Sequence, residues 1–129
     1  MRYASRIRKG LALVVGAYLA LMFFRNGVIK FDAEGFWTAP FERWGYPVWL
    51  RIVVGAIEAV GGALLVVPWL ATWAGLAVGG VMVGAGVTRA IDGNWVDVSW
   101  IALYMAASLW IAWEWRAWRV PRRTETPAA

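Results

Sequence analysis

The sequence predicts an all-α integral membrane protein, folded as a bundle of four transmembrane helices. The 129 residues are 61% hydrophobic, with a mean hydropathy of +0.57, whereas soluble domains are roughly 45–50% apolar. Four apolar stretches each approach the roughly 20 residues that a helix needs to cross a bilayer. The chain also contains 11 Trp residues, and membrane proteins concentrate Trp at the two interfaces with water.

The composition excludes several other classes of protein. The chain has no Cys and no His, so disulfides, thiolate zinc sites and the usual haem ligand are absent. The carboxylates do not cluster along the sequence, and we expect no metal site and no covalently bound cofactor. The net charge of +5 is attributed to anchoring at the cytoplasmic face, and no nucleic-acid partner is expected. No nucleophile–base pair is visible, so the catalytic residues and the question of enzymatic activity stay open.

The first predicted span covers residues 11–29 and follows a basic N-terminus at residues 1–10. A cleaved signal peptide is disfavoured, because bulky Phe23 and Phe24 and then Arg25 stand where small residues would mark a cleavage site. Residues 30–47 mix aromatic and charged side chains between Gly and Pro. We expect this loop to lie in the membrane interface, with room for one short amphipathic helix.

Three further spans are predicted, at residues 48–67, 70–91 and 96–113. Pro68 ends the second span, so a very short turn joins it to the third as an antiparallel hairpin. Asp92 to Trp95 forms the turn before the fourth span. The transmembrane domain is therefore assigned to residues 11–118, and residues 119–129 are expected to be a disordered cytoplasmic tail.

Lys and Arg set the predicted orientation, since short cytoplasmic loops carry an excess of both. The N-terminus and the flank after the fourth span each hold four basic residues. The loop after the first span is diluted by acids, and the last turn carries Asp92. Both termini are therefore expected in the cytoplasm, with the aromatic loop facing outward.

A charged group within the second span is the leading site candidate. Glu58 lies about 15 Å below the outer end of its helix, where a carboxylate needs a partner. Arg51 is seven residues earlier on nearly the same face, and Arg25, Lys30 and Arg89 lie near the outer ends of the first and third spans. We hypothesise an outward-facing polar pocket with Glu58 at its floor. Alternatively, these cations snorkel to the interface, and Glu58 forms only a structural ion pair; which cation pairs with it stays open.

Glycine is frequent within the second and third spans, where small residues allow helices to approach closely. The helix-packing candidates are Gly55, Gly61, Gly62, Gly75, Gly79, Gly80 and Gly84. A role in packing is preferred to a role in cradling a ligand.

Several short motifs over residues 11–91 resemble the DoxX-like family. They are Phe24-x-x-Gly27-x-x-Lys30-Phe31, Gly45-Tyr46-Pro47, Gly55-x-x-Glu58-x-x-Gly61-Gly62-x-Leu64 with Pro68, and Met82-x-Gly84-Ala85. The resemblance implies a four-helix protein of the bacterial inner membrane, linked to terminal quinol oxidase or thiosulfate:quinone oxidoreductase. Other members act in membrane assembly or redox-stress complexes. Arg89 stands about where many members carry a His.

Three functions follow from the resemblance and the charges. The first is an accessory subunit of a quinone-linked membrane oxidoreductase, with quinone as the ligand. The second is a non-enzymatic scaffold or assembly factor, and the third is a carrier of a small solute or lipid. The expected partners are the lipid bilayer and another membrane protein or further copies of the chain.

Overall fold

A computed structural model describes residues 2–118 of the chain, and the regular structure within them is entirely helical. The elements are α1 (Arg2–Ile29), α2 (Thr38–Arg43), α3 (Val48–Leu64), α4 (Ala71–Ile91), α5 (Trp95–Glu114) and the 3-10 helix η1 (Arg116–Trp118). The all-α prediction is confirmed. The predicted disordered tail, residues 119–129, lies outside the described residues.

Three of the described helices are long and apolar enough to cross a membrane: Tyr3–Ile29, Ala71–Ile91 and Trp95–Glu114. The chain is a helical membrane protein. The second span is shorter than predicted: α3 has 17 residues and ends at Leu64, whereas the predicted span ran to residue 67. Beyond that point Leu65 and Val67 bond three residues back, as in turns. Pro68 also disfavours helical geometry in the residue before it.

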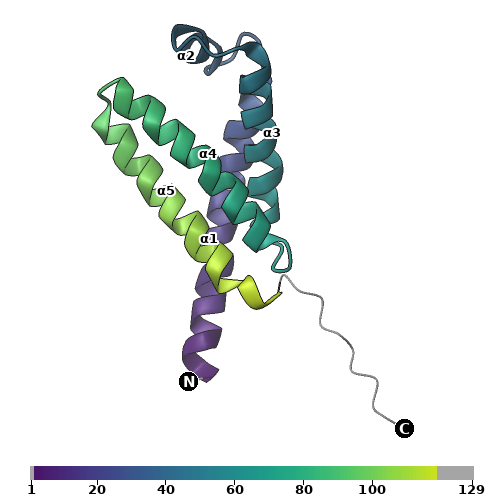
Figure 1. Ribbon diagram of the computed structural model, residues 1–129. Helices are drawn as coiled ribbons and strands as arrows, with labels where there is room; N and C mark the ends of the chain where they lie inside the picture. The colour runs from purple at the N-terminus through teal and green to yellow at the C-terminus, as the bar shows by residue number, and fades with distance from the viewer. Residues whose placement is uncertain (1, 119–129) are drawn as a thin grey trace.

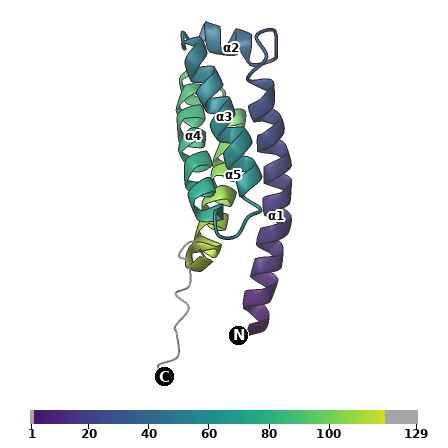
Figure 2. The same ribbon diagram turned by 90° about the vertical axis from the view of Figure 1, so that its right-hand side faces the viewer.

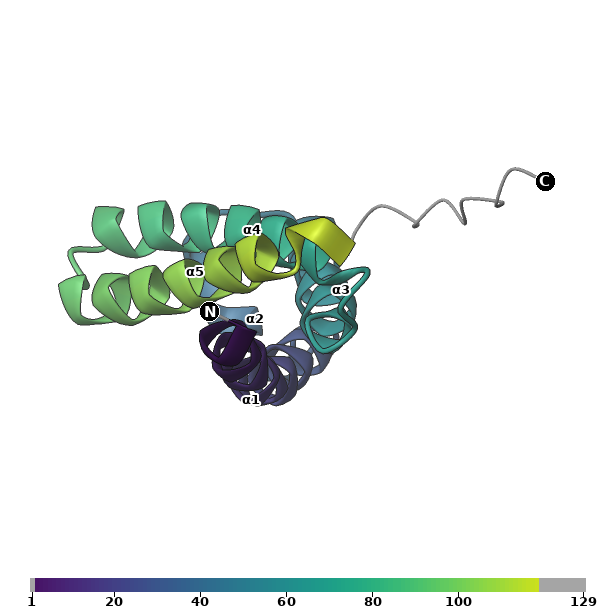
Figure 3. The ribbon, with the colours of Figure 1, turned by 90° about the horizontal axis from the view of Figure 1, so that it is seen from below.

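The four long helices form two antiparallel pairs, α1 with α3 and α4 with α5 (Figure 1). The two pairs lie against each other near the chain ends and diverge toward the end that carries α2. Seen from below, α1, α3, α4 and α5 follow one another around the bundle (Figure 3). The short turn does make α3 and α4 neighbours, but α3 packs more extensively on α1 than on α4.

Helix α1 has 28 residues and is about 42 Å long at 1.5 Å per residue. It begins at Arg2, so the predicted boundary at residue 10 is not a break in the structure. Arg, Lys, Ala and Leu favour helix, which lets the basic segment continue the span. The start of α1 extends below the rest of the bundle (Figure 2).

The turn between α4 and α5 has the hydrogen bonds of a Schellman motif. Gly93 adopts φ +72°, and the N–H groups of Gly93 and Asn94 donate to the carbonyls of Ala90 and Arg89. Glycine is favoured there because it has no Cβ to clash. Asn94 then caps α5 by accepting from the Asp97 N–H. The turn therefore sets the positions of Arg89 and Asp97.

Glycines make the closest contact between α1 and α3. A Cβ added to Gly27 would meet the Ala59 nitrogen and lie 2.5 Å from the Gly55 carbonyl oxygen. A Cβ on Gly62 would lie 2.6 Å from the Phe23 Cβ. Among the other predicted packing glycines, neighbouring helices approach closely at Gly61, Gly75 and Gly79, but no atom lies within 4 Å of a Cβ at Gly80 or Gly84. Gly27 is a further close contact that the packing prediction omitted.

Replacing Gly27 by Ala is expected to destabilise the bundle by about 1–3 kcal/mol, the usual range for overpacking. The added methyl group would collide with backbone atoms of α3, which cannot move aside as a flexible side chain can. Gly80→Ala is the matched control, because its methyl group meets open space. Thermal unfolding in detergent, followed by Trp fluorescence, would measure both. Equal stability of the two variants would contradict the close α1–α3 contact.

Candidate functional site

An ion pair between α1 and α3 forms the centre of the candidate site. Lys30 Nζ donates to Glu58 Oε2 at 2.8 Å, and both residues are only 4% exposed. Lys30 directly follows α1, and Glu58 lies in the second half of α3. Gly55 makes room for the pair, because a Cβ there would lie 2.9 Å from the Lys30 Cβ. The sequence left the partner of Glu58 open, and the structure identifies it as Lys30.

Arg51 is buried beside this pair, but its side chain forms hydrogen bonds to backbone carbonyls and not to Glu58. Its Nη1 donates to the carbonyl oxygens of Lys30 at 2.6 Å and Asp32 at 2.8 Å. The carbonyls at the C-terminal end of a helix have no donor within that helix, and Arg51 satisfies that of Lys30, which directly follows α1. The Asp32 carbonyl, in the turn that follows, also accepts from the Gly35 N–H and the Thr38 hydroxyl. Arg51 does not line the cavity described below. The Arg51 side chain therefore links the segment after α1 to α3.

Arg89 lies near the end of α4, between the aromatic loop and α5. Its Nε is 3.4 Å from Asp97 Oδ2. Its guanidinium lies 4.9 Å from the ring centroid of Trp44 and 5.6 Å from that of Trp37. A cation within about 6 Å of an aromatic ring is attracted to its face. Arg89 therefore links the loop electrostatically to the α4–α5 hairpin.

Arg25 lies apart from the other charged candidates. Its side chain is exposed, and it does not line the cavity. Its position in the sequence predicted that Arg25 lies at the level of the pocket along the bundle. Position along a helix does not specify whether a side chain faces the interior of the bundle or its outer surface. The position of Arg25 fits the snorkelling alternative.

Four aromatic residues of the loop, Trp37, Phe41, Trp44 and Tyr46, form what we call the aromatic clasp. Phe41 is buried and contacts the other three rings. Sequence reasoning assigned these residues to the membrane interface and missed their common packing, because the loop has no periodic pattern. Their density within ten residues was the available signal.

Two hydrogen bonds join the aromatic clasp to α4 and to the turn between α4 and α5. Trp44 Nε1 donates to Asp92 Oδ2 at 2.6 Å. Tyr46 and Thr88 join through their hydroxyl groups at 2.6 Å, and Thr88 also donates to the Gly84 carbonyl. Since the single Thr88 hydroxyl proton is used in the latter bond, Tyr46 is the donor to Thr88. The clasp thus bridges α3 and α4 at the α2 end.

A cavity of about 440 Å³ lies beneath the aromatic clasp, between the two helix pairs. This volume is within the range of small-molecule sites, which are largely apolar with a few polar groups. Of the predicted site residues, Lys30, Glu58 and Arg89 line it. The lining residues that sequence reasoning did not assign to a site include Asn26, Thr88, Asp97, Trp100 and Tyr104, together with the aromatic clasp.

The ion pair leaves hydrogen-bonding capacity facing this cavity. An ammonium group has three donors, and Lys30 uses one of them on Glu58. No hydrogen bond from residues 2–118 reaches the second carboxylate oxygen, Oε1 of Glu58. One edge of the cavity therefore presents a cationic donor beside an anionic acceptor.

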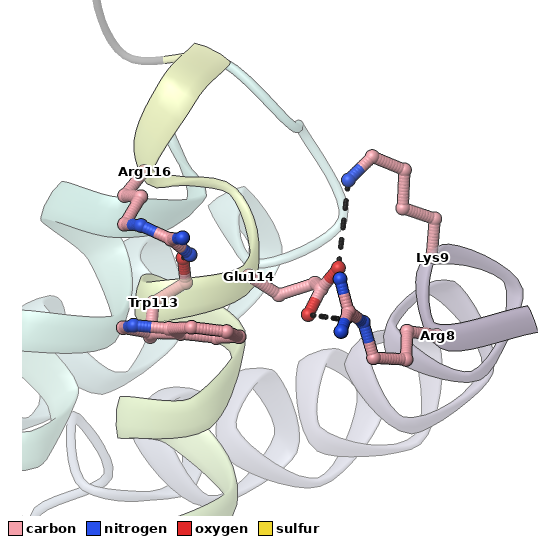
Figure 4. Close-up of polar contacts among 5 residues, drawn as sticks. All are labelled: Arg8, Lys9, Trp113, Glu114 and Arg116. Carbon is pink, nitrogen blue, oxygen red and sulfur yellow. Dashed lines mark hydrogen bonds and ion pairs between the residues drawn. The ribbon is translucent and has the colours of Figure 1, made fainter. Parts of the chain in front are cut away.

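A second buried carboxylate lies at the opposite end of the bundle. The Glu114 side chain is 2% exposed, with Lys9 Nζ 3.4 Å from Oε1 and Arg8 Nε 3.6 Å from Oε2 (Figure 4). Arg116 lies over the Trp113 ring, 3.9 Å from its centroid. The contacts of Arg8 and Lys9 with Glu114 join the start of α1 to the end of α5. Over the described range, 2–118, no three potential metal ligands gather in one place.

The comparisons with known proteins identify a family. No curated protein and no solved structure matches the chain. A family model described as the DoxX-like family matches residues 14–112, which include α3, α4 and most of α1 and α5. The match spans the cavity, the aromatic clasp and the Lys30–Glu58 pair, and the chain belongs to the DoxX-like family.

Proposed function

We propose that this protein is a membrane subunit that binds a quinone headgroup in the cavity, as part of a quinone-linked oxidoreductase. The observation that carries the proposal is the Lys30–Glu58 pair on the wall of an otherwise mostly apolar cavity of about 440 Å³. A quinone has the matching shape: a flat apolar ring with oxygens at opposite edges. The resemblance to the DoxX-like family, with its implied link to quinone-dependent oxidoreductases, agrees with this proposal.

The polar groups suit both redox forms of such a ligand. A quinone oxygen accepts hydrogen bonds, which the free N–H groups of Lys30 supply. A quinol hydroxyl donates, and Glu58 Oε1, which has no hydrogen bond from residues 2–118, accepts. The rings of the aromatic clasp offer stacking surfaces, which favour a planar ligand. The chain has no Cys and no His, so a partner protein would supply the electrons.

The proposed topology has four spans, with both termini in the cytoplasm of a bacterium and the protein in its inner membrane. Helix α3 is about 26 Å long at 1.5 Å per residue, close to the roughly 30 Å of a hydrocarbon core. Its packing along α1 supports membrane depth for the whole helix. The two ends of the described chain lie at the same end of the bundle (Figure 1). The α2 end would then face outward.

A partner in the membrane is part of the proposal. Gly80 is exposed on α4, and a Cβ there would meet no atom within 4 Å. Small residues on a lipid-facing surface allow another helix to approach closely. This observation also supports the second candidate function, a scaffold or assembly factor that holds another membrane protein or a further copy of the chain.

Replacing the ion pair by apolar residues is expected to remove quinone binding while preserving the fold. The double variant Lys30→Met/Glu58→Leu should be as stable as the parent, because exchange of a buried pair for apolar side chains is often neutral or stabilising. Affinity for a quinone, measured by quenching of Trp fluorescence in detergent, should fall at least tenfold, or about 1.4 kcal/mol. Arg25→Gln is the control, since Arg25 does not line the cavity. Full affinity in the double variant would refute the proposed site.

The topology predicts which engineered thiols are accessible from outside the cell. The chain has no native Cys, so single variants report unambiguously. Phe36→Cys, in the exposed aromatic loop, should react with a membrane-impermeant maleimide in spheroplasts. Tyr3→Cys, at the start of α1, should react only after permeabilisation. The reverse pattern would invert the proposed orientation, and labelling of both positions before permeabilisation would show that α1 does not cross the membrane.

A further inference from the structure

The end of the cavity near α2 is covered, which restricts how a ligand can reach it. The aromatic clasp spans this end and is bonded to α4 and to the α4–α5 turn through Tyr46–Thr88 and Trp44–Asp92. Lys30 Nζ lies 4.4 Å from the Trp37 ring centroid, and Arg89 lies over the same ring. Rings and cations therefore close the route along the bundle axis.

The side between α1 and α5 is packed less extensively than the other neighbouring pairs. The two helices lie near each other at the lower end of the bundle and separate toward the α2 end (Figures 1 and 3). Phe23 and Tyr104 meet edge to face at 6.2 Å between ring centroids. Above this contact, Asn26 on α1 and Trp100 on α5 line the cavity. We call this stretch the α1–α5 seam.

The α1–α5 seam joins the cavity to the outer surface of the bundle. Trp100 lines the cavity and is still 55% exposed, so its ring belongs to both surfaces. The flanking residues on the surface of α5 are apolar, including Val96 and Leu103. Such a surface faces hydrocarbon in a membrane protein, so the seam opens toward lipid.

An unpaired polar group marks the same place. The side-chain amide of Asn26 is half-buried, lines the cavity and has no hydrogen bond to any residue from 2 to 118. Asn26 is four residues before Lys30, which directly follows α1, so both side chains lie on about the same side of that helix. At membrane depth, water does not satisfy polar groups as it does at a protein surface. An amide in this position can donate to or accept from a ligand oxygen.

We propose that the ligand reaches the cavity sideways from the bilayer, through the α1–α5 seam. The ligand class is a lipid-dissolved molecule with one polar ring and a long hydrocarbon chain. The ring lies near Lys30 and Glu58 and receives a hydrogen bond from Asn26, while the chain leaves past Trp100 into lipid. This inference rests on the proposed quinone-binding function and adds the route and the chain-bearing class of ligand.

Photo-crosslinking in nanodiscs tests the route directly. The probe is a benzoquinone with a decyl chain and a diazirine near the middle of that chain, so that it reports the path of the chain and not the position of the ring. Crosslinks located by mass spectrometry should fall on Met22, Asn26 or Trp100 and disappear when unlabelled decylquinone is added. Competed crosslinks on Trp37 or Trp44 would overturn the lateral route while leaving quinone binding intact. No competed crosslink anywhere would overturn both proposals.

A matched pair of Trp variants distinguishes contacts with the hydrocarbon chain of the ligand from contacts with its quinone ring. Trp100→Ala should weaken decylquinone binding about fivefold more than it weakens the binding of a chainless benzoquinone, a difference of roughly 1 kcal/mol. Trp95→Ala, on the same helix and also exposed but outside the cavity lining, should change neither. Asn26→Leu should weaken both quinones, because the ring loses its donor. Identical effects of Trp100→Ala and Trp95→Ala would overturn the role of the α1–α5 seam.

Discussion

The buried ion pair between Lys30 and Glu58 is the contact on which the polar site at the α2 end of the bundle depends. Removing a lysine and a carboxylate from water is expensive, and only a close partner offsets the loss. The 2.8 Å contact meets that need. It is possible because Gly27 and Gly55 let the backbones of α1 and α3 touch. Arg51 then donates to the carbonyl of Lys30, directly after α1, and to that of Asp32 in the following turn, so the lysine is held by both its side chain and its backbone.

The cavity exists because the second helix pair does not follow the first along its whole length. Near the chain ends the pairs share an apolar core that includes Leu65, Val78 and Ile111. Toward α2 they diverge, and the aromatic clasp bridges them in place of direct helix packing. A site formed in this way has polar groups from both helix pairs, rings above it and lipid at its side. That combination suits a ligand that is partly polar and dissolved in the membrane.

Both ends of α1 are held by buried acids on other helices. Lys30 pairs with Glu58 of α3 at one end, and Arg8 and Lys9 pair with Glu114 of α5 at the other. Packing of small residues and polar contacts hold helices together in lipid, because lipid and side chains are equally apolar. The charges and the close glycine contacts at Gly27 and Gly62 therefore act together to position α1 against its neighbours. The cavity lies beside the upper of these two anchors.

The sequence by itself determined the properties that depend on local composition. Length and hydropathy predicted an all-α membrane protein, and a carboxylate deep in an apolar helix predicted a buried role for Glu58. The family was also identifiable, because its motifs are short and ordered along the chain. The tertiary structure alone decided which groups meet. The Lys30–Glu58 and Lys9–Glu114 contacts join residues 28 and 105 positions apart, and they depend on how each helix is rotated and crossed. The rotation of α1 leaves Arg25 exposed and brings Asn26 to the cavity, and the rotation of α3 directs Arg51 to backbone carbonyls. These outcomes could not be predicted, because depth along a helix does not specify the face that a side chain occupies.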